Sequence, residues 1–580
     1  MKKSDYILIL SLLILTVMGL YIWLPNTVAA QEATDFYVSE PTFLHYKLSQ
    51  APGVTSIVSN WILQLYRWVL VGCIVEGVLL ALMAWLCAQI PTSLGRKGYT
   101  ALALLAPLML LLAAPLDVSV ALQGVCFFAY ILCGLHIKRK AQRNIYVELM
   151  PWVGYLFMSW PLIILASIAV AWLPLLDVKK GKSDIKSAIV GTVGAILIAF
   201  ACVWMSNRWI GFIPLDRRYL YSPIEGVGTL PFILFSALSV GLMLVPRWQR
   251  AKSWMPLTLG LVLIVGTMIA CLSDKQRRSN EQQWYLSYLA DHHQWKKILE
   301  MLPEDRSQLD KPSAVYGMLA ELNLGTLPEH LNQYPIANGE DFLFRGNSKA
   351  MCCNFNRQFY ESIGVWDEAY RQTVQMGMKC KEGTSLSCQR HMLNYAIAES
   401  DWKVADKLLA VMKGTTWDAS MAKKAQRMVD ENRHRVVNKP LTDTVYVGMY
   451  EMTVELEMLL RKSPDNRQLL DLYLCSLLLD RRLPLFARTL TRYDYYQIHP
   501  LPRAYAEACI LVETTNDAPL MRQFHLPDMM RSKFDEFYSK LVQNHGLEEL
   551  SKYKGSYWYY FFEGQQLLDG EVVDGTMLGS

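Results

Sequence analysis

Long apolar runs alternate with short polar segments over the first 272 residues of the chain. A run of about 20 apolar residues is long enough to cross a membrane as a helix. Trp and Tyr stand at several ends of these runs, where amphipathic rings suit the membrane interface. The pattern predicts eight transmembrane helices, over Tyr6–Leu24, Trp68–Ile90, Tyr99–Ala114, Val118–Ile137, Trp152–Leu176, Ile185–Met205, Leu230–Val245 and Pro256–Leu272.

Beyond Leu272 the sequence pattern predicts a series of amphipathic helical hairpins. Gln358–Met376 contains Gly364 and Trp366 where a helix, a tight turn and a second helix require them, and Asn394–Met412 repeats the arrangement with Trp402. Both segments resemble the tetratricopeptide (TPR) pattern, and weaker copies precede and follow them. The fold predicted is all-α, with a polytopic helical membrane domain over residues 1–272 and a TPR-like α-solenoid over residues 273–580.

The distribution of charge divides the chain at the same point. The segment up to Leu272 holds 20 basic and 11 acidic residues, whereas the remainder holds 37 and 41. The low charge density of the first part is typical of a membrane domain in contact with lipids, and that of the second part is typical of a soluble domain. Because the second part is net acidic and has no basic stripe, nucleic acid is not expected as a partner.

Basic residues predict the orientation of the first four helices. Lys2–Lys3, Arg96–Lys97 and Lys138–Arg143 would all lie on the cytoplasmic side if the N-terminus is inside, in accordance with the positive-inside rule. The first apolar run is longer than a typical signal-peptide core, so we interpret it as an uncleaved anchor, although Val28–Ala30 resembles a cleavage site. Eight crossings would then place the C-terminal part in the cytoplasm.

No cofactor or metal site is predicted. The chain has no P-loop, no GxGxxG after a strand, no GxSxG and no HExxH motif. The cysteines show no disulfide-scaffold spacing, and Cys380, Cys388 and His391 lack the CxxC pairs of a zinc site. The adjacent His292 and His293 would not point in the same direction on a helix.

Glu76 is a carboxylate inside the second apolar run and is the most unusual intramembrane polar residue. Such a group normally faces the protein interior and has a hydrogen-bonding or functional role. Small residues of its helix, from Cys73 to Ala88, form a seam that allows close packing, and Glu76 borders this seam. We expect a protonated carboxyl group bonded to a neutral partner, with Gln123, Tyr130 and Ser159 as possible partners.

Three acidic residues in the first two external loops are the candidates for catalysis. Asp35 and Glu40 follow the first apolar run, where Glu32 also lies, and Asp117 lies between the third and fourth runs. Their positions resemble those of loop carboxylates in GT-C glycosyltransferases, which bind a metal or activate the acceptor. Some of those enzymes also carry TPR-like repeats, but on the catalytic side of the membrane, which conflicts with a cytoplasmic tail.

The chain as a whole resembles an uncharacterised family of multi-pass membrane proteins from Bacteroidales. The resemblance rests on the loop QEATDFYVSEPTFLHYKLSQAPGVTSIVSNWILQLY, on the hairpins IGVWDEAYR and WKVADKLLAVM, and on the segments LLDLYLCSLLLDRRLPLFARTL and LPRAYAEACILV. Residues 51–53 read Ala-Pro-Gly where the family has Pro-Gly-Gly. The resemblance implies a Gram-negative inner-membrane location and provides no catalytic residues.

The sequence therefore predicts an inner-membrane protein whose helical repeats bind a protein or an envelope component as a scaffold. The alternative is a GT-C-like transferase that uses Asp35, Glu40 or Asp117 with a lipid-linked sugar. A third possibility is a transporter with Glu76 in its path, although no second ionisable residue lies deep in an apolar run. Whether the chain is an enzyme is left open.

Overall fold

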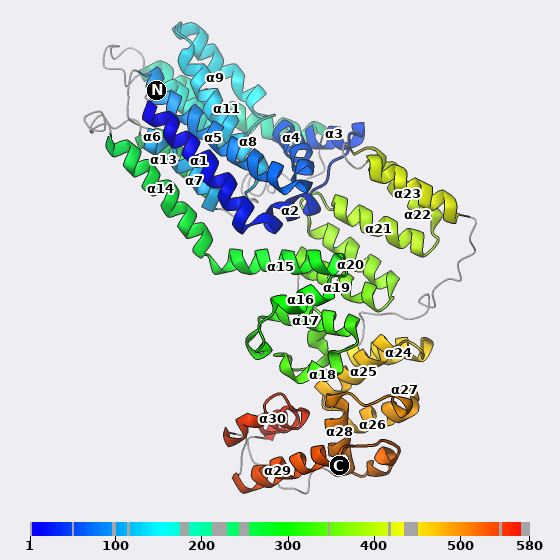
Figure 1. Ribbon diagram of the computed structural model, residues 1–580. Helices are drawn as coiled ribbons and strands as arrows, with labels where there is room; N and C mark the ends of the chain where they lie inside the picture. Colours follow the sequence, from blue (N-terminus) through cyan, green and yellow to red (C-terminus); the bar gives the residue numbers. More distant parts are fainter. Residues whose placement is uncertain are drawn as a thin grey trace. The chain divides into compact units, whose positions relative to one another are not determined.

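The protein is built from helices (Figure 1). The computed structural model describes residues 3–48, 52–94, 100–112, 116–173, 185–210, 229–242, 254–345, 349–415, 419–433, 451–544 and 548–569. Within these ranges there is no β-strand, so the predicted all-α fold class is confirmed. The helices form two compact units: Met1–Gln282 with Cys380–Arg390 and Lys403–Glu431, and Gln283–Lys379 with His391–Trp402 and Asn432–Ser580.

Five helices of the first unit are long and apolar enough to cross a membrane. They are α1 (Lys3–Trp23), α5 (Val69–Ser93), α8 (Val118–His136), α11 (Ile185–Ile210) and α14 (Trp254–Ser273). Shorter apolar helices are α6 (Thr100–Ala103) with α7 (Leu105–Leu112), α10 (Trp160–Trp172) and α13 (Thr229–Leu242). Each of the eight predicted runs thus coincides with apolar helix, while the run ends at Tyr99, Ala114, Leu176 and Val245 lie outside the described residues.

The predicted helix Trp152–Leu176 is wrong. Helix α9 (Lys140–Gly154) ends before a bend, and α10 begins at Trp160. Pro161 lies in the first turn of α10, where proline favours a helix start, and Ser159 before it is extended. The chain reverses at this bend: Tyr146 of α9 donates to the Tyr130 carbonyl near the end of α8 (2.9 Å), whereas the Ser159 amide donates to Gln123 near the start of α8 (3.0 Å).

Helices α1 and α14 run in the same direction. Early in both helices Gly260 faces Leu8, and late in both Met268 faces Gly19. Glu281, in the first turns of α15 (Lys275–Asp291), accepts hydrogen bonds from the backbone amides of Asn26 (2.9 Å) and Thr27 (2.7 Å), just beyond α1. The C-terminal ends of α1 and α14 therefore lie at the same end of the first unit.

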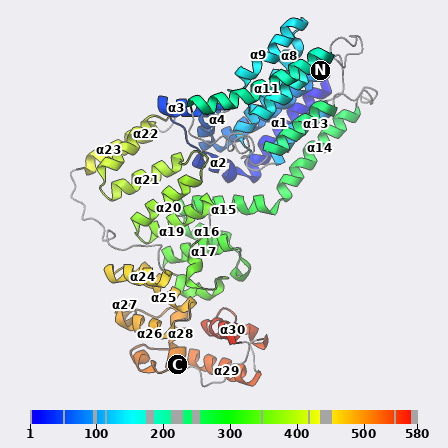
Figure 2. The same cartoon turned by 180° about the vertical axis from the view of Figure 1, so that it is seen from behind.

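Four short helices connect α1 to α5 and lie together at one end of the long helices in both views (Figures 1 and 2). They are α2 (Pro25–Thr34), α3 (Pro41–Leu48), α4 (Gly53–Leu63) and the 3-10 helix η1 (Gln64–Arg67). This segment carries most of the loop residues selected from the sequence. The first unit also contains α23 (Ala419–Asn432) from the C-terminal half of the chain, up to Glu431.

Most of the remaining helices form hairpins, and one type of turn recurs in them. They are α16 (Trp295–Met301), α17 (Lys311–Leu324), α18 (Leu327–His330), α19 (Ala350–Ser362), α20 (Trp366–Lys379), α21 (Leu386–Ala398), α22 (Trp402–Lys413), α24 (Met452–Lys462), α25 (Arg467–Leu479), α26 (Leu483–Arg492), α27 (Tyr495–Ile498), α28 (Arg503–Glu513), α29 (Asp528–Asn544) and α30 (Tyr557–Asp569). The two predicted hairpins are confirmed as α19–α20 and α21–α22.

The recurring turn has a residue in the left-handed conformation after the first helix. In the α19–α20 turn this residue is Gly364 (φ 78°), and the Val365 amide donates to the Tyr360 carbonyl five residues earlier (2.9 Å). This is the Schellman arrangement, which satisfies carbonyl groups at a helix C-terminus. The same bond and conformation occur at His293, Gly325, Ser400 and Arg481.

Candidate functional site

Three of the loop carboxylates selected from the sequence lie in one buried ionic cluster of the first unit. The cluster forms where the α2–α4 segment meets the stretch Cys380–Arg390. We define the loop cluster by the residues that contact one another there: Glu32, Asp35, Lys47, Asn60, Asp117, Lys381, Glu382 and Arg390.

Most charges of the loop cluster are paired. Arg390 contacts Glu32 at 2.5 Å between Nη2 and Oε1, and Lys381 lies 3.6 Å from Asp117. Lys47 forms an ion pair with Glu382, and both side chains are almost completely buried. Asn60 donates to the same Glu382 carboxylate at 3.2 Å. A buried pair of this kind holds two segments together, because removing either charge leaves the other without compensation.

Asp35 is the exception in the loop cluster. It follows α2 in an extended conformation, and its carbonyl accepts a hydrogen bond from the Leu386 amide at 2.9 Å. Its carboxyl Oδ2 is buried and has no hydrogen-bond partner among the described residues. Burial, assisted by the nearby Glu382 carboxylate, raises the pKa of Asp35 to about 8. A carboxyl group with such a pKa can donate or accept a proton near neutral pH.

The other two catalytic candidates have different surroundings. Glu40 is exposed to solvent just before α3 and is not among the described residues that form the loop cluster. The Asp117 carboxylate caps the N-terminus of α8 by accepting from the amides of Ser119 (2.8 Å) and Val120 (3.2 Å). The predicted trio therefore does not converge as a unit, and Asp117 has a structural role that explains its position.

The described residues contain no group of three or more His, Cys, Asp or Glu side chains that could hold a metal ion. Cys380 and Cys388 are both buried, and neither is in a disulfide. Because the carboxylates of the loop cluster are engaged by basic groups, the chemistry that the cluster can offer is proton exchange at Asp35.

The pKa of Asp35 predicts how stability depends on pH. The folded protein keeps this proton up to about pH 8, whereas the unfolded chain loses it near pH 4. In this window the folded state binds more protons, so stability falls as pH rises, with a limiting slope of about 1.4 kcal/mol per pH unit. We expect the thermal midpoint of Asp35→Asn to fall less between these pH values than that of the wild type.

The matched control is Glu40→Gln, which alters an exposed carboxylate of the same segment and should keep the wild-type pH dependence. Lys47, Lys381 and Glu382 surround Asp35 and are unchanged in both variants. Identical pH profiles for Asp35→Asn and the wild type would show that Asp35 is ionised in the folded protein.

Glu76 is buried in α5, and its partner differs from those predicted. Gln31 of α2 donates from its amide to Glu76 Oε1 at 2.9 Å. Tyr66, fully buried in η1, lies near the same carboxyl group. Gln123 accepts from the backbone amide of Ser159, and the Tyr130 hydroxyl pairs with that of Ser167 at 3.1 Å, so neither of these side chains bonds Glu76. The partner is neutral, as predicted, but it comes from the loop segment and not from a long helix.

This bond predicts different effects for two substitutions of Glu76. Glu76→Gln retains a group that can accept from the Gln31 amide, so it should fold and function almost normally. Glu76→Leu leaves that amide unpaired in a buried site and should cost roughly 1–3 kcal/mol. Thermal unfolding of the purified variants in detergent measures the difference. Loss of function in a well-expressed Glu76→Gln variant would instead favour a role in proton transfer.

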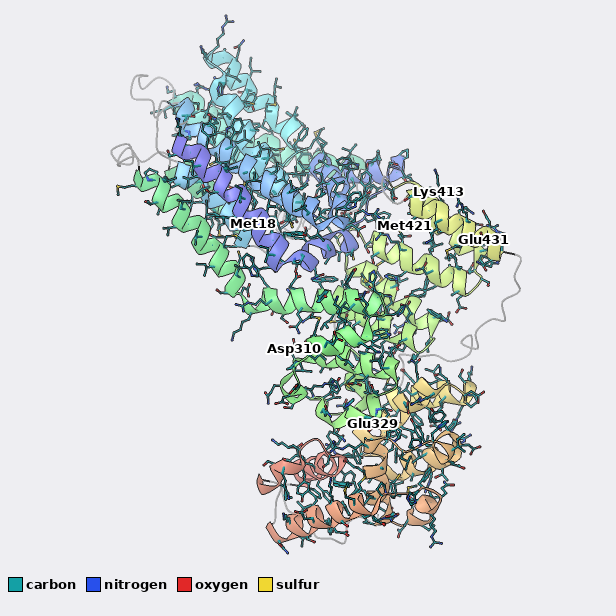
Figure 3. The ribbon with its side chains drawn as sticks, in the orientation of Figure 1. Met18, Asp310, Glu329, Lys413, Met421 and Glu431 are labelled. Carbon is teal, nitrogen blue, oxygen red and sulfur yellow. The ribbon has the colours of Figure 1, made fainter. Side chains whose placement is uncertain are left out.

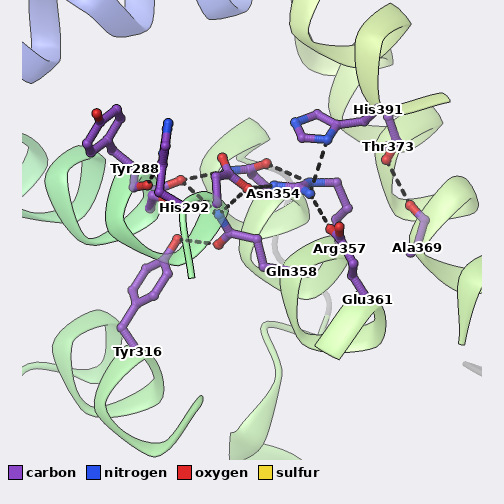
Figure 4. A network of polar contacts seen from close by, with 12 residues as sticks. Tyr288, His292, Tyr316, Asn354, Arg357, Gln358, Glu361, Ala369, Thr373 and His391 are labelled. Carbon is purple, nitrogen blue, oxygen red and sulfur yellow. Dashed lines mark hydrogen bonds and ion pairs between the residues drawn. The ribbon is translucent and has the colours of Figure 1, made fainter. Parts of the chain in front are cut away.

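The second unit contains its own buried polar network, centred on Arg357 of α19 (Figure 4). The guanidinium group is completely buried, forms an ion pair with Asp291 and contacts Glu361 at 2.7 Å. It also donates to Asn354 Oδ1 at 3.0 Å and to the Tyr395 hydroxyl at 3.3 Å. Burial would raise the pKa of Asp291, but Arg357 holds it below its usual value. The network joins residues of α15, α19 and α21.

An open pocket of about 470 Å³ lies among α24, α25, α26 and α27 of the second unit. Its walls include three arginines, Arg461, Arg467 and Arg492, together with Tyr493 and Tyr495. The sequence analysis did not select any of these residues. Their separation along the chain gives no recognisable motif, and only the hairpin packing brings them together.

Sequence reasoning also missed the basic half of the loop cluster. Lys47 carried no signal of its own in the sequence, Lys381 and Glu382 lie in the linker that precedes α21, and Arg390 lies in α21 itself. The pairs join residues more than 250 positions apart, for example Arg390 and Glu32. Without an alignment, no feature of a single sequence links such distant charges.

Comparison with known proteins identifies a family but no activity. A family model described as "Family of unknown function (DUF6057)" matches residues 2–564. No curated protein and no solved structure matches the chain. The family match covers the apolar helices, the loop cluster and the helical hairpins together. The chain therefore belongs to DUF6057, a family of unknown function.

Proposed function

We propose that this protein is an integral membrane protein that holds a helical-repeat unit on the outer side of the bilayer, where the unit binds a protein or an envelope component. The observation that carries the proposal is the contact of Glu281 with Asn26 and Thr27. This contact supports a location of the α2–α4 segment and the start of the C-terminal part on the same side of the membrane.

Outward-facing apolar side chains support insertion into a membrane. On α1, Leu10, Ile14 and Met18 are about half exposed, and Figure 3 shows Met18 on this helix. On α14, Val262 and Ile269 are equally exposed. Large apolar side chains that cover whole faces of long helices are unfavourable in water and favourable in lipid.

The distribution of basic residues supports the orientation. Lys2–Lys3 and Lys138–Arg143 favour a cytoplasmic N-terminus, so α1 would end on the outer side. The α2–α4 segment and the first turns of α15 would then both be external. In a Gram-negative inner membrane this is the periplasmic side, opposite to the location expected from eight crossings.

Reporter fusions test this orientation. Alkaline phosphatase fused at the C-terminus should be active and green fluorescent protein fused there should be dark, because the first reporter folds outside the cytoplasm and the second inside it. The same reporters fused after Lys138 should give the reverse result and serve as the internal control. A fluorescent C-terminal fusion with inactive phosphatase would contradict the proposal.

Photo-crosslinking tests the binding role. Met378 on α20 is strongly exposed, and Val374 precedes it by one turn on the same face. A photoreactive residue at Met378 of the full-length protein should give a discrete adduct in intact cells. The control position is Met529 on α29, which is also strongly exposed. Absence of any discrete adduct from Met378 and from other exposed positions of the hairpins would argue against a docking unit.

A second function, a GT-C-like transferase, is supported by the unpartnered carboxyl oxygen of Asp35. In GT-C enzymes the repeats lie on the catalytic side of the membrane, which conflicts with a cytoplasmic C-terminal unit. An external C-terminal unit would remove this conflict. Asp35→Asn should then abolish transfer from a lipid-linked sugar without loss of folded protein. Glu40→Gln, on the same segment, should retain activity. Unchanged cell phenotype and lipid-linked sugar levels in Asp35→Asn would exclude this function.

A further inference from the structure

The pocket of the second unit presents arginine side chains that are held in place by aromatic rings. The guanidinium of Arg467, at the start of α25, lies 5.0 Å from the ring centre of Tyr495. That of Arg492, at the end of α26, lies 5.9 Å from the ring centre of Tyr493. Stacking on a ring leaves the edge of the guanidinium available to donate hydrogen bonds, and it reduces the freedom lost on binding.

The three arginines differ in how their charge is compensated. Arg461 forms an ion pair with Glu457 at 2.5 Å, and Arg467 lies 3.5 Å from the buried carboxylate of Asp471. Arg492 has no carboxylate partner among the described residues and lies over the Tyr493 ring. The positive charge available to a ligand is therefore concentrated at Arg492.

Two acidic residues, Asp465 and Asp494, also line the pocket. Carboxylates accept hydrogen bonds from hydroxyl or amino groups and repel a second anionic group. The lining thus combines donors for an oxyanion with acceptors for neutral or cationic donors. A volume of about 470 Å³ is in the range of small-molecule sites, which is roughly 300–1,000 Å³.

We propose that this pocket binds a small ligand, or the end of a larger one, that carries an oxyanion beside hydroxyl or amino groups. Arg492 pairs with the oxyanion, Arg467 and Arg461 donate further hydrogen bonds, and Asp465 and Asp494 accept from the adjoining groups. The oxyanion is a phosphate monoester or a carboxylate, since planar guanidinium groups recognise both. This inference rests on the proposed binding role of the helical-repeat unit and specifies its ligand.

Calorimetric titration of the detergent-purified full chain tests the proposal with three probes: glucose 6-phosphate, glucuronate and glucose. The sugars share their hydroxyl groups and differ in the anionic group. At least one anionic probe should bind saturably, and glucose should not. Binding of glucose 6-phosphate alone assigns a phosphate, and binding of glucuronate alone assigns a carboxylate. Equal binding of all three probes, or of none, would overturn the proposal.

Two variants of α26 identify the site. Arg492→Gln removes the uncompensated charge and should weaken binding about tenfold or more, because a hydrogen bond between charged groups is lost. Arg488→Gln is the matched control, since Arg488 is exposed one turn earlier, lies 4.0 Å from Asp517 and does not line the pocket. Equal affinities of the two variants would refute the assignment.

The result of the calorimetric titrations does not depend on the results of the reporter-fusion and photo-crosslinking experiments. If no probe binds but Met378 gives a discrete adduct from an external unit, this inference fails and the proposed function stands. If the C-terminal fusion reports a cytoplasmic location while Arg492 is still required for binding, the proposed function fails and the pocket assignment stands.

Discussion

Replacement of Arg357 by methionine is expected to lower the free energy of unfolding of the second unit by roughly 3–5 kcal/mol. The substitution keeps most of the side-chain volume but removes the charge that compensates Asp291 and Glu361. Both carboxylates are partly buried, with 28% of each side chain exposed, and would be left close together. Asn354 and Tyr395 would also lose a donor. Chemical denaturation of the purified protein, followed by tryptophan fluorescence, measures the change.

The control for this prediction is Lys540→Met on α29. Lys540 forms an ion pair with Glu536 at 2.7 Å, but both side chains are exposed, so the change should cost less than about 1 kcal/mol. A triple variant in which Arg357, Asp291 and Glu361 become Met, Asn and Gln should recover part of the stability, because no charge is then left uncompensated. A loss from Arg357→Met no larger than that from Lys540→Met would contradict the interpretation.

Replacement of Lys47 by methionine is expected to have a comparable local cost, roughly 3–5 kcal/mol, because it leaves Glu382 buried without its cation. The effect should be confined to the loop cluster. We expect the amide protons of Cys380–Arg390 and of the α2–α4 segment to exchange faster with solvent. Hydrogen–deuterium exchange with mass spectrometry, peptide by peptide, measures this loss of protection.

The matched control is Lys413→Met at the end of α22, labelled in Figure 3. Lys413 contacts Gln426 at 3.1 Å on the exposed surface, so its loss should not alter exchange in the loop cluster. A double variant, Lys47→Met with Glu382→Leu, should restore part of the protection, since neither charge remains. If Lys47→Met left exchange of Cys380–Arg390 unchanged, the ion pair would not hold this segment.

Much of the fold could be predicted because apolar periodicity reports which helix faces are buried. Each of the eight apolar runs contains apolar helix, although Trp152–Leu176 is interrupted by a bend, and Gly364 and Trp366 marked a real hairpin. The aromatic residues of α30 also pack inside, where the Trp558 indole donates to the Glu507 carbonyl at 2.7 Å. The hairpin pattern is local, so a single sequence is sufficient to reveal it.

The reversal of the chain between α9 and α10 could not be predicted in the same way. Hydropathy responds to the composition of Trp152–Leu176 and not to the direction of the chain, so it cannot detect a reversal between two apolar segments. Pro161 was a visible signal that a helix could begin there. Helix α9 is too polar to resemble a membrane span, so hydropathy did not indicate that it packs alongside the apolar helices.

The candidate site was predicted only in part. A single sequence can indicate that one residue is unusual, but it does not indicate which distant residues surround it. Asp35 and Glu76 attract attention because a carboxylate beside or within apolar sequence requires an explanation. Their surroundings depend on residues that are distant in sequence, such as Lys47 with Glu382. Glu40 was indistinguishable from Asp35 by composition, and only burial separates the two.

Residues of the loop cluster are far apart in the sequence, and this separation has a consequence for biosynthesis. Glu32 and its partner Arg390 are 358 residues apart. At a translation rate of about 5–20 residues per second, Glu32 would wait roughly 20–70 s for Arg390 to be synthesised. During this time the nascent α2–α4 segment lacks the partner of Glu32 and cannot adopt its final arrangement. Assembly of the loop cluster is therefore completed only after translation has passed Arg390, and until then the segment is accessible to proteases and chaperones.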